Sequence, residues 1–140
     1  MSRVMYAEGA YLKKNPSWHA EDSAWKAKQI INILNQNNIH PKSVVEVGCG
    51  CGEILNQLHL HMPEDTVFIG YEISPQAFEL CQQRKKKRLN FHLKDFVQEK
   101  DASYDVVLCI DVLEHTEDYL SFLRRLREKG KYKIFHIPLD

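Results

Sequence analysis

The chain has 140 residues, of which 44% are hydrophobic and 27% charged, a composition typical of one globular domain and too short for a two-domain enzyme. Its 19 Lys and Arg residues balance 19 Asp and Glu residues, which argues against a protein whose affinity comes from neutralising nucleic-acid phosphates. No apolar stretch approaches the roughly 20 residues of a membrane span, and the N-terminus has no signal-peptide core, so no membrane partner is expected. The four cysteines are expected to be reduced thiols of a cytoplasmic protein.

Helices and strands are predicted to alternate along the chain. After an irregular lead-in over 1–16, a helix begins at a cap on Asp22 or Ser23 and ends near Asn37. Short β-branched or apolar runs predict strands over 43–47, 66–71, 89–93, 104–110 and 132–137. Helical spacing of apolar residues predicts helices over 52–60, from Ser74-Pro75 onward, and over 115–128. This alternation indicates an α/β fold with a parallel sheet, in which ligands bind at the carboxyl ends of the strands.

The sharpest motif is a glycine-rich loop, Glu46-Val47-Gly48-Cys49-Gly50-Cys51-Gly52, between the first strand and its helix. Alternate glycines let the backbone turn tightly and approach a ligand closely. Glu72 ends the second strand 20 residues after Gly52, a spacing at which a carboxylate can accept hydrogen bonds from ribose hydroxyls. Together the loop and Glu72 predict a nucleoside-containing ligand across the first two strand ends.

The charges around this loop indicate which nucleoside fits. The dinucleotide fingerprint G-x-G-x-x-G requires glycine at position 53, where this chain has Glu53, so a nicotinamide-dependent oxidoreductase is disfavoured. Glu46 and Glu53 place negative charge on both sides of the loop, which repels a pyrophosphate and favours a cation. S-adenosylmethionine fits this pattern because it carries a ribose, a sulfonium and an ammonium group and no phosphate.

Four stretches carry a resemblance to a known family: VVEVGCGCGEI, IGYEIS, LKDF and YDVVLCIDVLEHTED, in this order. Over residues 43–138 the chain resembles the class I S-adenosylmethionine-dependent methyltransferases. The resemblance implies a Rossmann-like, doubly wound parallel sheet of about five strands in the order 3-2-1-4-5, with helices on both faces. It also implies S-adenosylmethionine as cofactor, S-adenosylhomocysteine as product and a small-molecule acceptor.

The resemblance further implies roles for individual residues. It assigns the methionine end of the cofactor to Glu46, Gly48, Cys49, Gly50 and Gly52, the ribose to Glu72, the adenine to Ile73, Asp95 and Phe96, and the reacting end to Ile110 and Asp111. The run Leu113, Glu114 and His115 would face the substrate. If the acceptor carries a proton, His115 is the first candidate for a general base and Asp111 the second. Residues available for a lid over the substrate are Tyr11, Trp18, His19 and Trp25.

Several of these residues have a structural alternative. Asp95 can cap a turn, Phe96 can belong to the core, and His115 can merely start a helix. The two tryptophans can anchor the N-terminal helix to the sheet. Cys49 and Cys51 lack a neighbouring Cys or His pair that would complete a zinc site, so they are interpreted as small loop residues.

Two charged clusters are open to more than one interpretation. Asp111, Glu114 and His115 have the i, i+3, i+4 spacing of one helix face and could hold a divalent ion, as a similar E-x-x-E-H run does in metal-dependent RNA 2′-O-methyltransferases. Asp replaces the first Glu here, and metal-free methyltransferases carry a similar run, so no metal is predicted. The basic run 84–88 is expected to be a solvated helix end, with a nucleic-acid patch as the less favoured alternative.

The chain ends at Asp140, whereas the family continues past the fifth strand with a helix and a β-hairpin. A fifth strand with an unpaired edge predicts a domain fragment, a truncated product, or a partner chain or dimer that covers the edge. One domain over 1–140 is expected, with an N-terminal segment over 1–40 as a candidate lid and a cofactor-binding core over 41–140. The predicted function is methyl transfer to a small molecule. A cofactor-binding module without turnover and a metal-dependent RNA 2′-O-methyltransferase are the alternatives.

Overall fold

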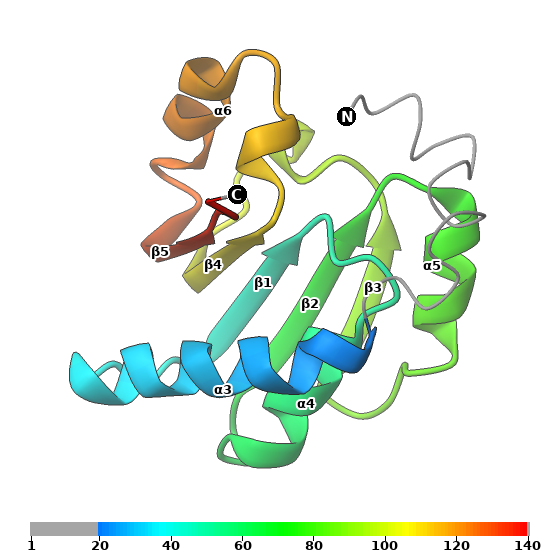
Figure 1. The fold of residues 1–140 in the computed structure, drawn as a ribbon, viewed down its shortest axis with the longest axis vertical. Coiled ribbons are helices and arrows are strands. Elements are labelled where there is room, and N and C mark those ends of the chain that lie inside the picture. Colours follow the sequence, from blue (N-terminus) through cyan, green and yellow to red (C-terminus); the bar gives the residue numbers. More distant parts are fainter. Residues whose placement is uncertain (1–19, 140) are drawn as a thin grey trace.

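The structure is a computed structural model that describes residues 20–139, and there five parallel strands form one sheet in the order β3-β2-β1-β4-β5 (Figure 1). The strands are β1 (Ser43–Val47), β2 (Val67–Glu72), β3 (Leu89–Leu93), β4 (Tyr104–Ile110) and β5 (Gly130–His136). The helices are α3 (Ala20–Gln36), α4 (Glu53–His61), α5 (Pro75–Gln82) and α6 (Tyr119–Leu126), with 3₁₀ turns η1 (Phe96–Gln98) and η2 (Leu113–His115). The predicted fold class and strand order are confirmed. None of the helices in residues 20–139 combines the length and apolar character of a membrane span.

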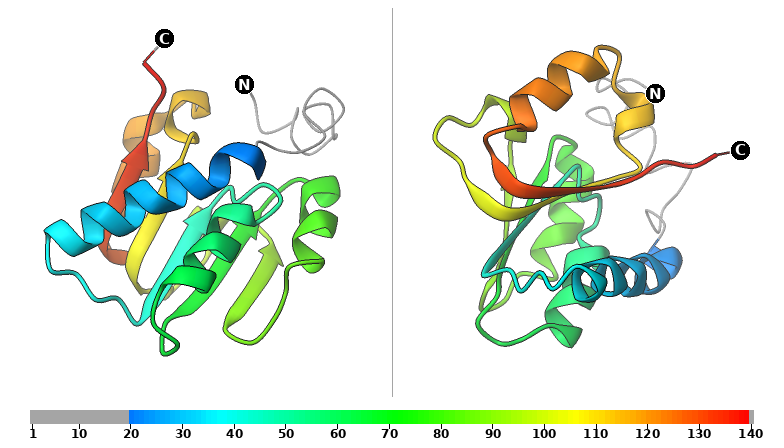
Figure 2. Two further views of the ribbon diagram at one scale, coloured as in Figure 1. Left: turned by 60° about the horizontal axis from the view of Figure 1, so that its bottom comes forward. Right: turned by 90° about the vertical axis from the view of Figure 1, so that its left-hand side faces the viewer.

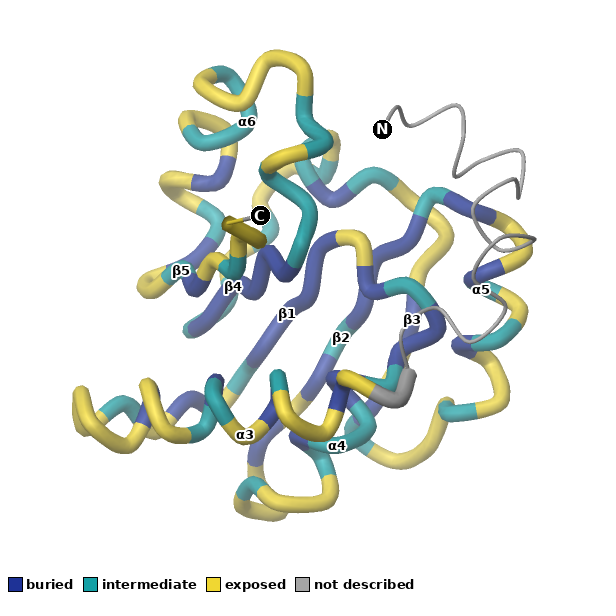
Figure 3. Tube along the Cα trace, viewed as in Figure 1, coloured by how far each residue is buried: buried dark blue, intermediate teal, exposed yellow. Residues whose placement is uncertain are grey.

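The sheet has an apolar core on each face because its strands are hydrophobic on both sides. On one face, α3 and α4 pack on Val44, Val106 and Leu108 through residues such as Leu34 and Leu55. On the other face, the core consists of Val45, Val47, Val107, Cys109, Phe96 and Leu126, together with partly buried neighbours. Figure 2 shows α6 on the opposite side of the sheet from α3 and α4, and Figure 3 shows the buried central strands between them. The sheet is thus covered on both faces, and its carboxyl edge is the place left for a ligand.

Several element boundaries differ from the sequence prediction. The helix α3 begins at Ala20, so Asp22 and Ser23 lie within it and the predicted cap is wrong. The predicted helix over 115–128 is instead the short turn η2 followed by α6. The interruption has a local cause, because the Asp118 side chain accepts a hydrogen bond from Ser121 N at 3.2 Å and starts a new helix there. The strands β2 and β5 also begin at Val67 and Gly130 rather than at 66 and 132.

The predicted start of α5 is confirmed. Ser74 is the N-cap, its hydroxyl accepts a hydrogen bond from Ala77 N at 3.4 Å, and Pro75 occupies the first turn. Ser74 is fully buried, so this hydroxyl satisfies a backbone N–H that water does not reach. The cap therefore fixes where the chain turns from the end of β2 into α5.

We expect Ser74→Ala to lower the free energy of unfolding by about 1 kcal/mol, because the buried amide of Ala77 loses its acceptor. Urea denaturation measures the change. Glu79→Ala is the matched control, since Glu79 lies exposed on the same helix. Equal unfolding midpoints for Ser74→Ala and the wild type would contradict the role of the cap.

Candidate functional site

A cavity of about 650 Å³ opens at the carboxyl ends of β1, β2 and β4. This volume lies within the range of roughly 300–1,000 Å³ typical of small-molecule sites. Of the residues assigned to cofactor binding, Glu46, Gly48, Cys49, Gly50, Glu72, Ile73, Asp95, Phe96, Ile110 and Asp111 line it, and His115 does so too. Gly52 is absent from the wall and instead caps α4. Seven carboxyl side chains but only three lysine or arginine side chains line the cavity within the described residues, so its field is negative.

The glycine-rich loop has the backbone conformation that its sequence predicts. Gly48, Gly50 and Gly52 have φ angles of 66°, 59° and 84°, in the left-handed region that favours glycine. Cys49 N donates to Tyr71 O at 3.0 Å, which attaches the loop to the end of β2. A Cβ at Gly52 would lie 2.7 Å from the Phe91 ring, so this position also lacks space for a side chain.

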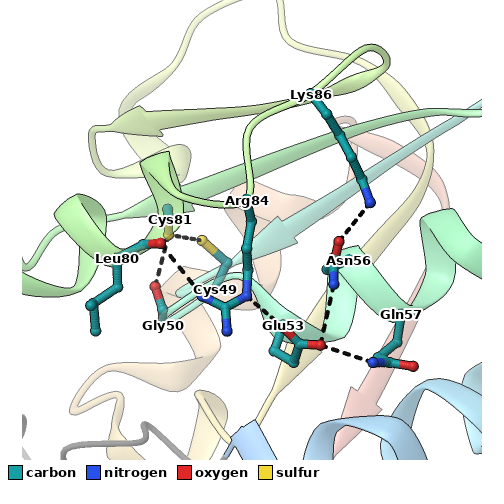
Figure 4. Close-up of polar contacts among 9 residues, drawn as sticks. All are labelled: Cys49, Gly50, Glu53, Asn56, Gln57, Leu80, Cys81, Arg84 and Lys86. Carbon is teal, nitrogen blue, oxygen red and sulfur yellow. Dashed lines mark hydrogen bonds and ion pairs between the residues drawn. The ribbon is translucent and has the colours of Figure 1, made fainter.

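Side chains of α5 and of the residues after it hold the loop from one side (Figure 4). The Cys81 thiol donates to Gly50 O at 2.9 Å and lies 3.7 Å from the Cys49 sulfur. Arg84 Nε donates to Glu53 Oε2 at 2.5 Å, in an ion pair that joins the end of α5 to the start of α4. Burial alone would raise the pKa of Glu53, but hydrogen bonds from Arg84 and neighbouring amides lower it. All four cysteines are buried free thiols, and sequence reasoning missed this support of the loop because its partners lie about 30 residues apart.

The basic run 84–88 is not part of a helix, since α5 ends at Gln82. Lys85, Lys86 and Lys87 are exposed, in line with the solvated interpretation. Arg84 is used in the Glu53 ion pair, so only part of the run is a free basic surface.

Glu72 is the buried carboxyl group that joins the loop to β2. Its Oε1 accepts a hydrogen bond from Gly50 N, and its Oε2 accepts from Ile73 N and Ser74 N, all at 2.8 Å. The residue is only 3% exposed, and burial raises the pKa of its carboxyl group while the three backbone amides partly offset that rise. A carboxylate has about four acceptor sites, so Oε1 retains capacity for a further donor in the cavity.

Glu46 is equally buried but, unlike Glu72, has a side-chain oxygen that accepts no hydrogen bond within residues 20–139. It is 2% exposed, and its Oε1 has no hydrogen-bond partner among the described residues. Burial raises the pKa of its carboxyl group well above the ordinary range, with further increases from Cys81 and Glu72. Because a buried polar atom without a partner is costly, the free oxygen on the cavity wall marks a place where a donor or cation would be stabilised.

Asp95 and Phe96 each line the cavity and also have the structural role considered for them, a turn cap for Asp95 and a core position for Phe96. The Asp95 side chain accepts from Val97 N at 3.3 Å and caps η1, and it also lines the cavity. Phe96 is 1% exposed and belongs to the core, where its ring lies 5.0 Å from that of Tyr71 and 5.9 Å from that of Tyr104. Its ring therefore forms both the cavity wall and the core beneath it.

The Asp111 carboxylate is fixed by two basic side chains from distant elements. Its Oδ2 accepts from Lys26 Nζ of α3 at 2.6 Å, and its Oδ1 lies 2.5 Å from His136 Nδ1 at the end of β5. Burial opposes ionisation, but hydrogen bonds and charge from Lys26 and His136 outweigh it and lower the pKa of Asp111. A carboxylate so held is a poor proton acceptor, so the geometry disfavours Asp111 as a general base. His136 had no predicted role.

The expected helix face with Asp111, Glu114 and His115 does not form. Asp111 has a left-handed φ of 60° and precedes η2, so the i, i+3, i+4 argument for a metal site fails. His115 Nε2 lies 3.8 Å from Glu114, while the Asp111 carboxylate binds Lys26. No group of three metal-ligating side chains is found in residues 20–139.

Of the residues proposed for a lid, only Trp25 lies in the described part of the chain. Its side chain is 58% exposed, so most of it is not packed on the sheet. Its ring meets the His136 ring edge to face, with 6.4 Å between centroids. Tyr11, Trp18 and His19 lie outside the described residues.

Known proteins resemble this chain in both sequence and fold. A family model described as a methyltransferase domain matches residues 45–129, which include the glycine-rich loop, Glu72, Asp95 and Asp111. The chain belongs to this methyltransferase family. The structure of the plantazolicin methyltransferase BpumL in complex with SAH has the same fold, with a TM-score of 0.64 and 19% identity over 91% of this chain and 48% of that chain.

Two curated methyltransferases are similar in sequence. A norajmaline N-methyltransferase from Rauvolfia serpentina is 26% identical over 108 residues, which are 72% of this chain and 36% of that protein. A ubiquinone biosynthesis O-methyltransferase from Vibrio campbellii is 27% identical over 120 residues, which are 76% of this chain and 50% of that protein. The matched part of this chain thus spans between about a third and a half of the length of these two relatives.

We expect Gly52→Ala to destabilise the protein more than Gly48→Ala. Both residues have positive φ, which costs a residue with a Cβ about 1–2 kcal/mol. At Gly48 the new Cβ would meet only a Val112 methyl group at 3.0 Å, whereas at Gly52 it would overlap the Phe91 ring at 2.7 Å. Overpacking adds about 1–3 kcal/mol at Gly52. Thermal unfolding of both variants tests this, and equal losses would contradict the steric argument.

Proposed function

We propose that the cavity binds S-adenosylmethionine and that the protein catalyses transfer of its methyl group to a small acceptor. The observation that carries the proposal is the hydrogen bond from Gly50 N to Glu72 Oε1. It brings the glycine loop after β1 and the carboxylate after β2 into contact at the edge of the cavity, where a ribose with adjacent hydroxyls fits. The family assignment and the fold support the same donor.

The individual residues receive the following proposed roles. The unpartnered Glu46 oxygen faces the ammonium group of the methionine end, and Glu72 accepts from the ribose. The loop residues Gly48, Cys49, Gly50 and Gly52 shape the path of the ligand, Ile73, Asp95 and Phe96 surround the adenine, and Ile110 and Asp111 lie at the reacting end. The negative field of the cavity favours a ligand with two cationic groups over a dinucleotide.

Methyl transfer from a sulfonium needs in-line attack and no covalent help from the protein. The bound cofactor supplies the electrophilic methyl group. The contribution of this chain is to orient donor and acceptor at attack distance and to exclude water, an effect that can reach several kcal/mol. The fixed carboxylates and the rigid loop are suited to that task, because few of their groups must reorganise on binding.

A small acceptor is supported by the relatives, whose names specify a norajmaline N-methyltransferase and a ubiquinone biosynthesis O-methyltransferase. We propose nitrogen or oxygen as the methylated atom for the same reason. The metal-dependent RNA alternative loses its structural basis, since its three ligands do not share a helix face. The other alternative, a cofactor-binding module without turnover, is tested by experiment. Formation of S-adenosylhomocysteine with any acceptor would exclude it.

The remaining expectations from the sequence stay predictions. They are a single domain over 1–140 with a candidate lid over 1–40 and a cofactor-binding core over 41–140, a cytoplasmic location, and a partner chain or dimer that covers β5. In the described sheet β5 has a strand on one side only. Size measurement in solution tests the partner.

We expect the protein to bind S-adenosylhomocysteine with micromolar affinity and NAD not at all, measured by calorimetric titration. Glu72→Gln should weaken binding by about tenfold or more, because the buried carboxylate loses an acceptor and its charge, and a charge-assisted bond contributes about 1.5–3 kcal/mol. Glu79→Gln on the exposed face of α5 is the matched control. Unchanged affinity in a folded Glu72→Gln variant would refute the site, and equal binding of NAD would refute the ligand.

Affinity should also depend on pH through Glu72. Burial raises the pKa of this carboxyl group, and the protonated form loses acceptor capacity for ribose hydroxyls. Affinity for S-adenosylhomocysteine should therefore fall as pH decreases through the raised pKa, beginning above the usual glutamate value of about 4.3. Titrations between pH 8 and pH 4.5 measure this. The Glu72→Gln variant should lack the part of the slope that belongs to Glu72, and an identical slope in both proteins would contradict the assignment.

A further inference from the structure

A cluster of three side chains lies at the carboxyl ends of β4 and β5. Asp111 follows β4, His136 is the last residue of β5, and Lys26 comes from α3. Each oxygen of the Asp111 carboxylate has a different partner, Lys26 Nζ at 2.6 Å and His136 Nδ1 at 2.5 Å. Asp111 lines the cavity at the end where the methyl group would be transferred, so the imidazole is held directly beside the cavity wall.

The backbone also fixes this arrangement. Asp111 N donates to His136 O at 2.9 Å, which continues the β4–β5 pairing one residue past the end of β4. Asp111 has a φ of 60°, a conformation that costs a residue other than glycine about 1–2 kcal/mol. Such strain is kept where the surrounding contacts require it, and it is frequent at functional sites. Here it accompanies a carboxylate bound to both Lys26 and His136.

We propose that His136 is the general base of methyl transfer and that Asp111 is its positioning residue. This inference rests on the proposed function, since only a methyl transfer needs such a base here. It also specifies the acceptor class: a hydroxyl or amine that still carries its proton, for which a base is required. A carbanion or a preformed thiolate would not need it.

The hydrogen-bond pattern leaves His136 with the correct nitrogen available. Because Asp111 Oδ1 accepts at Nδ1, the imidazole proton resides on Nδ1 and the lone pair on Nε2. Nε2 makes no hydrogen bond to another residue in the described part of the chain, and the side chain is 39% exposed. His136 lies next to Asp111, which lines the cavity, so an acceptor that extends past Asp111 would meet Nε2, whereas both Asp111 oxygens are already occupied.

The neighbouring surface suits an aromatic acceptor. The exposed Trp25 ring meets the His136 ring edge to face. A planar ring that bears a hydroxyl or an amine could rest against the indole with its polar atom toward Nε2. Phenols and aromatic amines are thus the first probes of choice.

The proposed step conserves atoms and charge. His136 Nε2 accepts the proton of the acceptor O–H or N–H while the oxygen or nitrogen lone pair forms the bond to the methyl carbon. The electron pair of the breaking carbon–sulfur bond goes to sulfur, which becomes neutral, and the positive charge passes to the imidazolium. Asp111 stabilises that imidazolium through Nδ1–H, and Lys26 keeps the carboxylate in place.

The first test needs neither acceptor nor turnover. In protein labelled with ¹⁵N-histidine and saturated with S-adenosylhomocysteine, neutral His136 should show a protonated Nδ1 and an unprotonated Nε2, with the signal assigned by its loss in His136→Asn. In Asp111→Asn, Lys26 holds the amide oxygen, so the amide nitrogen faces Nδ1 and the proton should move to Nε2. A protonated Nε2 in the wild type, or no change in Asp111→Asn, would overturn the proposal.

The second test measures methyl transfer to catechol and aniline across pH 6–9. His136→Asn and His136→Gln should lower kcat about 10²–10⁴-fold and remove the acidic limb of the pH profile, with the affinity for S-adenosylhomocysteine retained. His40→Asn, at an exposed position before β1, is the matched control, and His115→Asn tests the rival base. Urea denaturation shows whether each variant folds. If one His136 variant does not fold, the kcat and pH profile of the other His136 variant test the proposal.

The outcomes separate the two proposals. A wild-type protein that binds no S-adenosylhomocysteine would refute the proposed function and the base with it. Binding without methylation of either probe would overturn the proposed acceptor class while leaving the cofactor site intact. Wild-type kcat and pH profile in folded His136 variants would overturn the base alone.

Discussion

The hydrogen bond between Gly50 N–H and the buried Glu72 carboxylate is the interaction on which the site depends. A carboxylate that is almost fully buried must be satisfied by the protein, and here three backbone amides do so. Two of these amides belong to the turn into α5, and the third belongs to the loop after β1. The single side chain of Glu72 therefore determines how two neighbouring strand ends and two helix starts are placed, and the cavity lies between them.

The glycine-rich loop contacts Glu72 on one side and Cys81 on the other, and the neighbouring Glu53 is bound by Arg84. These contacts determine which acidic groups near the loop remain without an ion-pair partner. Glu53 was expected to repel a pyrophosphate, but its carboxylate is paired with Arg84 at the end of α5. The carboxyl groups near the loop that have no ion-pair partner of comparable proximity among residues 20–139 are then Glu46 and Glu72, and burial raises the pKa of both. The Cys81 thiol donates to the Gly50 carbonyl, so side chains of α5 and of the residues after it hold both the backbone of the loop and the Glu53 carboxylate.

The sequence predicts those features whose signals are local. Apolar runs identify all five strands, and the spacing between Gly52 and Glu72 is informative because β1 and β2 are parallel neighbours, with Val47 beside Tyr71. Side-chain partners far apart in sequence give no such signal. Lys26 and Asp111 are separated by 85 residues, and His136 reaches Asp111 only because β4 and β5 pair in this register. The proposed role of His136 thus depends on tertiary structure.

Three acidic side chains on one cavity wall show why residue type alone does not assign a role. Glu46 is buried with a raised pKa and an oxygen that is unpartnered among the described residues. Glu72 is buried but bound by backbone amides, and Asp111 is held between Lys26 and His136 with a lowered pKa. The first suits a cation, the second suits hydroxyl donors, and the third suits the orientation of an imidazole. The environment that each strand end provides therefore suits the three side chains to the different tasks proposed for them, which are binding the two ends of a cofactor and positioning a base.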